Sequence, residues 1–369
     1  MGPTTQTCKM KAYLRNTFLV LVLTTGLAAC GTTLQTQQVS TAEMATEVAA
    51  QKEFALKDKF YLANRTQNIG FDILTASAPL CGEKIRPALG MGFWTMESFS
   101  GDWRQAARNA FGIGQAVEVS RVAAKSPAAI GGLQKGDVLV KVGRHEVEAG
   151  KKGLSALQDY LQKNLTKNSL EVVYARTGVD GNDAVRTTTL TPVAACDYQV
   201  LYDDSTEVNA YADGRRIIMQ RGILEFSRND DEIAMIIGHE LAHNVLNHVQ
   251  KKTTQAAAGM LGGLLLDVLA GTGGEFTELG GRLGAQAYSP AYESEADYMG
   301  LYATARAGYN IERAPQLWRR MGARNTRAID MTSTHPATAE RFVSLEKTVR
   351  EIQQKQQQGL PLVPDEKTR

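Results

Sequence analysis

The chain has 369 residues, of which 43% are hydrophobic and 22% are charged, and its formal net charge is +2. A chain of this length can form two domains that each bury a hydrophobic core. Acidic and basic residues are nearly balanced and form no dense basic patch, so nucleic acid is excluded as an expected partner.

The first thirty residues have the organisation of a secretory signal. Lys9, Lys11 and Arg15 precede an apolar run over residues 18–29, which is too short to span a bilayer as a stable helix. A buried core segment is the alternative for such a run. Its position at the N-terminus, after a basic flank, favours the signal peptide.

The apolar run ends in a pattern associated with lipid attachment. Leu27-Ala28-Ala29-Cys30, followed by Gly31, resembles the bacterial lipobox. The resemblance implies that residues 1–29 are a lipoprotein signal peptide and that Cys30 carries a lipid anchor to the membrane. Gly31 stands where an aspartate commonly retains lipoproteins in the inner membrane, which favours the outer membrane of a bacterial cell envelope, facing the periplasm. Residues 30–45, rich in Thr, Gln and Ser, are predicted to be a tether.

Two further cysteines, Cys81 and Cys196, would then lie in an oxidising compartment. Two cysteines there are expected to pair, so we predict one disulfide that closes the chain around the segment between them. A reactive thiol is the alternative, and a mass shift on reduction distinguishes the two.

The segment between these cysteines has the element order of a small β domain. A strand over residues 117–122, a short helix opened by Ser126-Pro127 and a turn at Gly136-Asp137 before another strand are followed by a helix and two strands. This order resembles a PDZ domain, which we place at residues 111–195. The resemblance implies binding of extended peptides, including peptide C-termini, with Phe111-Gly112-Ile113-Gly114 as the best candidate for the carboxylate-binding loop. A structural insert that only restricts access to a cleft is the alternative.

An apolar-periodic stretch from Asn229 to about residue 252 predicts a helix that contains His-Glu-Leu-Ala-His. His239 and His243 lie four residues apart and share one helix face, as two ligands of one zinc ion would, while Glu240 stands beside them as a general base. Zinc in a catalytic site takes three protein ligands, so the motif predicts another ligand elsewhere. His248 would point away from His239 on a continuous helix, and we assign it a structural role.

Glu293 is the most plausible third ligand, on a second predicted helix. Asp297 lies four residues further along the same face, where its carboxylate can accept the free ring N–H of a ligand histidine. Glu295 points elsewhere. The sequence thus predicts one zinc ion per chain, held by two histidines and one glutamate.

These motifs together resemble the gluzincin metallopeptidases, which include the CAAX prenyl endopeptidases and the bacterial HtpX and BepA proteases. The resemblance implies an α+β fold, with a mostly helical core and a small β-sheet built from residues 46–110 and 196–352, followed by a polar tail over 353–369. It also implies that substrate lies extended along an edge strand formed by Asn209, Ala210, Tyr211 and Ala212.

The resemblance extends to Thr334-His335-Pro336 and Arg341. It implies that His335 approaches the zinc and occupies its open position in a latent state, and that Arg341 helps to stabilise the oxyanion. A surface turn is the alternative for a histidine before proline.

Two features depart from that family. Ser289-Pro290-Ala291 precedes the ligand helix where relatives often carry a basic residue, and the membrane spans of the prenyl endopeptidases are missing. The apolar stretch 256–270 contains Asp267 and is too short to be a good transmembrane helix, so we expect it to pack near the cleft or to gate it.

The sequence therefore predicts a zinc endopeptidase that cleaves unfolded or misassembled envelope proteins. A latent peptidase that acts mainly as a chaperone or assembly factor is the alternative. Prenyl-protein processing is disfavoured, because the motif is not accompanied by membrane spans and the signal peptide directs the chain out of the cytoplasm.

Overall fold

The computed structural model describes residues 37–178, 181–270, 275, 278, 288–324, 335 and 339–366. The predicted signal peptide, Cys30, Thr334 and Pro336 lie outside these residues. Within them, we find no helix with the length and apolar character needed to cross a membrane. By its contacts the chain divides into residues 1–49 and 50–369.

The first described helix, α2, is 36 residues long and spans Thr41–Ala76, so it takes in the last residues of the predicted tether. Its buried side chains start at Leu56. Ile69 and Ile73 belong to the same core as the apolar residues of the predicted metal helix. This placement joins the segment before the inserted domain to the helical core, although the whole inserted domain separates them in sequence.

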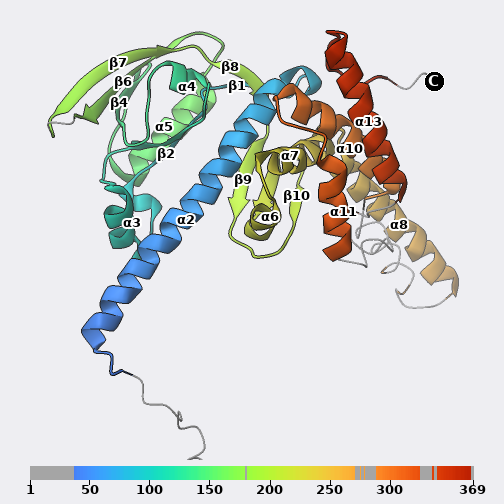
Figure 1. The fold of residues 1–369 in the computed structure, drawn as a ribbon, viewed down its shortest axis with the longest axis horizontal. Coiled ribbons are helices and arrows are strands. Elements are labelled where there is room, and N and C mark those ends of the chain that lie inside the picture. Colours follow the sequence, from blue (N-terminus) through green and yellow to red (C-terminus); the bar gives the residue numbers. More distant parts are fainter. Residues whose placement is uncertain are drawn as a thin grey trace, which may run out of the picture. The chain divides into compact units, whose positions relative to one another are not determined.

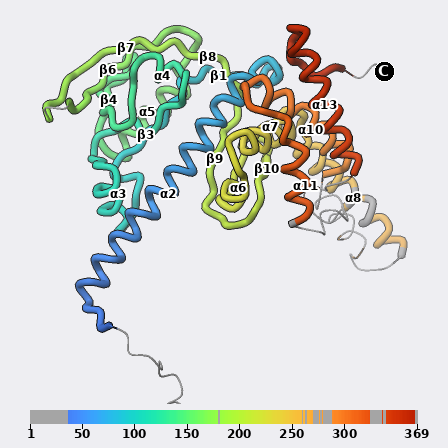
Figure 2. Tube along the Cα trace, in the orientation of Figure 1, coloured from blue at the N-terminus to red at the C-terminus, as the bar shows by residue number. Residues whose placement is uncertain are grey.

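A two-stranded stem carries the inserted domain. Strand β1 (Ile85–Ala88) pairs antiparallel with β8 (Val193–Cys196), and Ile85 lies opposite Cys196. Beside this pair, Cys81 and Cys196 form the predicted disulfide, with 5.6 Å between their Cα atoms. The insertion therefore leaves and re-enters the helical domain at one point, which Figure 2 shows along the chain trace.

Loss of this disulfide, in a chain with both cysteines replaced by serine, is expected to lower the free energy of unfolding by about 2–3 kcal/mol. The bond joins residues 115 positions apart, so it restricts the unfolded chain. Much of the closed loop folds as its own domain, which keeps the effect below the range expected for a flexible loop of that length. Urea unfolding of the oxidised, reduced and serine forms measures it, and an unchanged midpoint would contradict the expectation.

The inserted domain is the predicted PDZ-like fold, with a six-stranded sheet in the order β2-β3-β4-β6-β7 and β5 paired to β4. Its elements are β2 (Met91–Trp94), β3 (Glu118–Val122), α4 (Pro127–Ile130), β4 (Val138–Val142), β5 (His145–Glu146), α5 (Gly150–Asn164), β6 (Leu170–Thr177) and β7 (Asp183–Leu190). Leu139, Leu157 and Val172 lie in its buried core. Figure 1 shows α5 against the concave side of this sheet.

Two expectations for this domain were wrong. The sheet starts at Met91 rather than after residue 111, because β2 is a four-residue strand and its one glycine, Gly92, hides the alternating pattern. The candidate loop at 111–114 does not lead into the edge strand. Phe111 ends helix α3 (Trp103–Phe111), and Gly112 caps it with φ of 70°. Leu89 and Gly90 instead lead directly into the edge strand, β2.

The second sheet has three strands in the order β10-β11-β9. Strand β10 (Ala210–Ala212) pairs antiparallel with β11 (Arg216–Gln220), which pairs parallel with β9 (Gln199–Asp203). The segment predicted as an edge strand therefore lies at an edge of this sheet, with Asn209 directly before it. Its backbone groups on the outer side have no neighbouring strand within the sheet.

The helical core is built from α6 (Arg221–Phe226), α7 (Asp230–Val245), α8 (His248–Ala270), α10 (Pro290–Arg306), α11 (Ala314–Arg324) and α13 (Ala339–Gln357). The fold is thus the predicted combination of helical core, small sheet and PDZ-like β domain. Several large apolar side chains of α8 are exposed, among them Leu265 at 67% and Leu269 at 83%. Part of the predicted polar tail contacts the helical core, because Arg306 donates a hydrogen bond to the Leu362 carbonyl (3.0 Å).

Helix α7 starts as predicted but ends earlier. The Asn229 side chain caps it by accepting a hydrogen bond from the Glu232 N–H (3.0 Å). The predicted continuous helix to residue 252 is wrong, since α7 ends at Val245 and α8 starts at His248. Asn247 takes a left-handed backbone conformation, with φ of 56°, which separates the two helices.

Candidate metal centre

Helices α7 and α10 lie side by side and carry the predicted ligands (Figure 1). Their crossing depends on two glycines. A Cβ atom at Gly238 would lie 2.7 Å from the Gly300 carbonyl oxygen, and one at Gly300 would lie 2.8 Å from the His239 backbone nitrogen. Both distances are too short for real atoms, so glycine is required at each position. The close approach at Gly238 is therefore to the backbone of a second helix.

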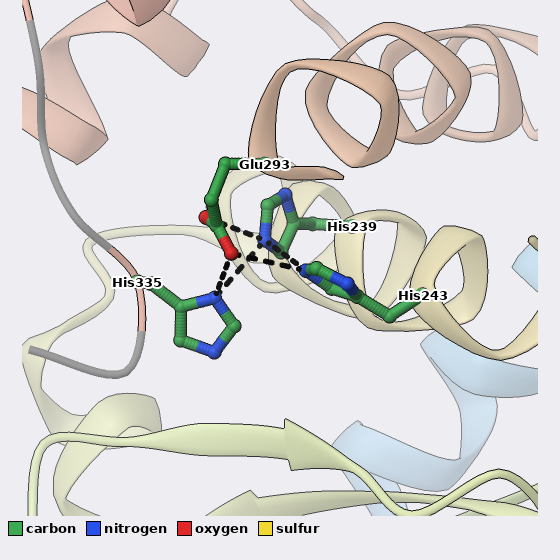
Figure 3. A group of neighbouring side chains, drawn as sticks. All are labelled: His239, His243, Glu293 and His335. Carbon is green, nitrogen blue, oxygen red and sulfur yellow. Dashed lines mark hydrogen bonds and ion pairs between the residues drawn. The ribbon is translucent and has the colours of Figure 1, made fainter. Parts of the chain in front are cut away.

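The crossing brings the three predicted ligands together. The Nε2 atoms of His239 and His243 lie 3.1 Å apart, and the two carboxylate oxygens of Glu293 lie 3.6 Å and 3.4 Å from them. His335 completes a group of four whose ligand atoms all lie within 4.8 Å of one another. Figure 3 shows the four side chains converging on one point from α7, α10 and the segment that carries His335.

This donor set fits a divalent metal ion such as zinc. Burial lowers the pKa of His243 well below its usual value, so its imidazole is neutral and can donate a lone pair. Burial alone would raise the pKa of Glu293, but the charges of His335 and Arg341 outweigh it and hold that pKa well below its usual range. Two buried imidazoles and an ionised carboxylate are a ligand set of catalytic zinc sites.

Glu240 lies beside the donor group and is 2% exposed. Its Oε2 atom is buried and has no hydrogen-bond partner among the described residues. Burial raises the pKa of this carboxyl, as expected for a proton acceptor that must work near neutral pH. The Ala212 backbone N–H lies close enough to this carboxylate to lower its pKa, so Glu240 is next to the end of edge strand β10.

Asp297 and Arg341 form a buried charged layer behind the ligands. The Asp297 Oδ1 atom lies 3.0 Å from His239 Nδ1, as the spacing predicted. Arg341 donates two hydrogen bonds to the Asp297 carboxylate, each 2.8 Å long, and its Nη1 lies 2.8 Å from Glu293 Oε2. The guanidinium of Arg341 therefore binds two carboxylates, those of Asp297 and Glu293. This geometry favours a positioning role for Arg341 over the predicted contact with an oxyanion.

His248 was expected to point away from the metal ligands, and the structure places it against one of them. Its Nδ1 atom lies 3.1 Å from His243 Nδ1, and its Nε2 atom lies 3.1 Å from Glu295 Oε2. The break at Asn247 is the reason, because the expectation assumed a continuous helix. Asn is tolerated in the left-handed conformation that ends helices, so this signal was present in the sequence. His248 remains outside the group of four metal-binding side chains.

Two aromatic residues near the site carry no motif and were not identified from the sequence. Tyr288 stacks on His243, with ring centroids 3.9 Å apart. Trp318 packs at 5.0 Å from His239 and lies under the Arg341 guanidinium at 5.3 Å. Their contacts fix the orientation of the two imidazoles, and only the tertiary fold brings them there.

His335 lies over the open side of the three ligands. Its Nδ1 atom is 2.9 Å from Glu293 Oε1 and 3.4 Å from His239 Nε2, and its Nε2 atom is 3.7 Å from Glu240 Oε1. The side chain is 11% exposed, which does not fit the alternative of a surface turn. The imidazole therefore stands between the ligands and the base.

Comparison with known proteins identifies both domains. Residues 189–349 match the profile of peptidase family M48, and residues 118–176 match a PDZ domain profile. Mitochondrial metalloendopeptidase OMA1 of Saccharomyces cerevisiae is 28% identical over 156 residues, which are 40% of this chain and 45% of the relative. The protein of that name from Arabidopsis thaliana is 32% identical over 152 residues, 39% of this chain and 30% of the relative.

The beta-barrel assembly-enhancing protease of Escherichia coli is 23% identical over 154 residues, which are 38% of this chain and 32% of that protein. The chain thus spans less than half the length of each of these relatives. The two profile matches thus assign residues 189–349 to peptidase family M48 and show a PDZ domain ahead of the metal helix in the same chain.

Proposed function

We propose that the chain is a zinc-dependent endopeptidase of the bacterial cell envelope that cleaves unfolded or misassembled envelope proteins. One observation carries the proposal: the buried carboxylate of Glu240, with an unpartnered oxygen, lies beside two histidines and a glutamate arranged as metal ligands. The names of the bacterial relatives, which describe proteases of β-barrel assembly, support the class of substrate. The disulfide supports an oxidising compartment.

His239, His243 and Glu293 would hold one zinc ion. When the zinc is bound, it would lower the pKa of a water molecule and polarise the scissile carbonyl. Glu240 accepts the proton of the attacking water and passes it to the leaving amine. Asp297 orients His239 through its Nδ1 atom. In this proposal the chain's own groups bring water, proton acceptor and peptide bond together.

The substrate would lie extended along β10, with Asn209, Ala210, Tyr211 and Ala212 offering main-chain groups at the sheet edge. Main-chain pairing accepts many sequences, which suits unfolded proteins. Because Ala212 is next to the Glu240 carboxylate, a peptide paired with this strand passes close to the base. The PDZ domain would bind substrate C-termini, and the Cys30 lipid would hold the enzyme at the outer membrane, facing the periplasm.

Metal removal tests the proposal. Purified protein that starts at residue 31 is incubated with an unfolded outer-membrane protein before and after treatment with a chelator. Cleavage is expected to stop on chelation and to return with zinc, because in this proposal the metal ion acidifies the attacking water and polarises the scissile carbonyl. Cleavage that continues at full rate in the chelated protein, with its metal content measured as zero, would refute it.

The position of His335 favours a second candidate, a latent peptidase that acts mainly as a chaperone or assembly factor. Since the imidazole stands between the ligands and Glu240, substrate and water can enter only when it moves away. In this state the edge of β10 remains available for an unfolded client, while hydrolysis is blocked.

Replacing His335 by alanine is expected to raise turnover of an unfolded substrate on the order of tenfold, as it would if about one molecule in ten is open in the parent protein. The measurement is the initial cleavage rate with zinc content matched. A fall in rate would show that the imidazole takes part in turnover instead, and an unchanged rate would remove both roles.

A further inference from the structure

His248, the first residue of α8, is a buried histidine that the proposed mechanism does not use. Its side chain is fully covered and lies between a metal ligand and a carboxylate at the surface. The Nδ1 atom is 3.1 Å from His243 Nδ1, and the Nε2 atom is 3.1 Å from Glu295 Oε2. One imidazole thus connects α7 to α10 through both of its nitrogens.

The orientation of the His243 ring determines which of its nitrogens carries the hydrogen. Its Nε2 atom faces the other ligand atoms, at 3.1 Å from His239 Nε2 and 3.4 Å from Glu293 Oε1. A metal ion bound at this point requires a lone pair on Nε2, and a neutral imidazole has only one N–H group. The hydrogen therefore lies on Nδ1, which is the atom that faces His248.

This assignment also fixes the hydrogen of His248. Because the His243 Nδ1–H donates, His248 Nδ1 must accept, so it carries no hydrogen. The single N–H of a neutral His248 is then on Nε2, where it donates to the Glu295 carboxylate. Two hydrogen bonds thus lead from the metal ligand through His248 to Glu295, and each donor in them has an acceptor.

The backbone break before α8 and two residues of α10 hold His248 in this place. Asn247, with φ of 56°, separates α7 from α8, so that α8 starts at His248 itself. Tyr292 and Glu295 are three residues apart and share a face of α10. The Tyr292 ring stacks on the imidazole, with centroids 4.5 Å apart, while Glu295 contacts its Nε2 atom. Contacts to its face and to its edge therefore set the orientation of the ring.

The two ligand histidines are supported in different ways. His239 Nδ1 lies 3.0 Å from the carboxylate of Asp297. His243 Nδ1 meets an imidazole instead, and the nearest carboxylate beyond it is that of Glu295. Groups that bind the free N–H of a ligand histidine orient the ring and raise metal affinity. His248 is placed to do for His243 what Asp297 does for His239.

We propose that His248 is a positioning residue of the metal site. Its Nδ1 atom accepts the His243 Nδ1–H and so holds that ring with Nε2 free for the metal, while the His248 Nε2–H is bound by Glu295. The inference rests on the metal site of the proposed function, and it concerns metal binding rather than hydrolysis.

Two replacements of similar size separate this role from packing. The Oδ1 atom of an asparagine can take the place of the imidazole Nδ1, whereas leucine offers no acceptor. His248→Leu is expected to weaken zinc binding by about ten- to hundredfold, and His248→Asn to keep it within about threefold of the parent. Competition with a chelator of known affinity measures the dissociation constants of the full chain. His145→Gln, on β5 of the PDZ domain, is the control for loss of a histidine and is expected to bind zinc as the parent does.

Unchanged zinc affinity in His248→Leu would overturn the proposal. An equal loss in both variants would overturn it too, because it would show that only the packing of the ring on Tyr292 matters. Thermal unfolding of the metal-free proteins shows whether each variant folds. If the parent itself binds no zinc, the proposed metal site fails and the inference fails with it.

Ring-nitrogen NMR tests the hydrogen positions in the parent and decides the proposal even if His248→Leu does not fold. The chain has five histidines, so labelling with ring-¹⁵N histidine gives few signals, and the signal that is lost in His248→Asn identifies His248. In the zinc-loaded protein, His248 is expected to carry a hydrogen on Nε2 and none on Nδ1. A hydrogen on its Nδ1 atom would overturn the proposal.

Discussion

Replacing Glu240 by glutamine is expected to reduce hydrolysis of an unfolded substrate by about 10²- to 10⁴-fold, while zinc content and fold remain unchanged. The amide has the shape of the carboxylate but cannot accept the proton of the attacking water. Glu240 is not among the four side chains whose ligand atoms converge, so its replacement leaves the metal ligands intact. Initial cleavage rates, zinc content and thermal unfolding of parent and variant measure the three quantities.

Glu225→Gln is the matched control for this experiment. Glu225 lies on α6 with its side chain 57% exposed and pairs with Arg221, so the same chemical change there is expected to leave the rate unaltered. Cleavage at the parental rate by Glu240→Gln, with zinc bound, would mean that another group accepts the proton. Loss of zinc in this variant would mean that Glu240 belongs to the ligand set.

The parts of the site that follow helical periodicity were predictable from the sequence. His239 and His243, and likewise Glu293 and Asp297, are separated by four residues, so each pair shares a helix face whatever the rest of the fold does. The capping of α7 by Asn229 is equally local. Such features depend only on residues within one or two helical turns of each other, and these residues can be read directly from the sequence.

The parts that depend on contacts between distant segments were not predictable. The crossing of α7 and α10 at Gly238 and Gly300 requires knowledge of which helices meet. His248 was misplaced because one residue, Asn247, separates α7 from α8. Strand β2 was missed because a four-residue edge strand with a glycine has almost no periodic signal. In each case the local sequence pattern did not contain enough information, and contacts between distant segments determined the structure.

Arg341 is the residue whose role the structure changes most. The family resemblance implied an oxyanion contact, but Arg341 is 2% exposed and its guanidinium is bound by Asp297 and Glu293. Burial would by itself raise the pKa of Asp297, yet the charge of Arg341 outweighs it and lowers that pKa. The arginine therefore keeps Asp297 ionised and, together with the charge of His335, keeps the neighbouring Glu293 ionised as well.

Replacing Arg341 by methionine is expected to lower the free energy of unfolding by about 3–5 kcal/mol, because it leaves Asp297 buried without its counter-ion and Glu293 with only the charge of His335. Methionine keeps much of the packing on Trp318, so the loss reports on charge more than on volume. Zinc affinity is expected to fall as well, since Glu293 and, through Asp297, His239 lose their support. Urea unfolding of the metal-free and zinc-loaded proteins, with a zinc titration, measures both effects.

The double variant Arg341→Met, Asp297→Asn separates positioning from oxyanion stabilisation. Removing one of the stranded carboxylates is expected to recover part of the lost stability, because contacting residues in one charge network are not additive. An oxyanion role predicts the opposite pattern: parental stability and zinc affinity in Arg341→Met, with turnover alone reduced. Stability that falls in the single variant and rises again in the double variant would therefore assign Arg341 to the support of the ligands.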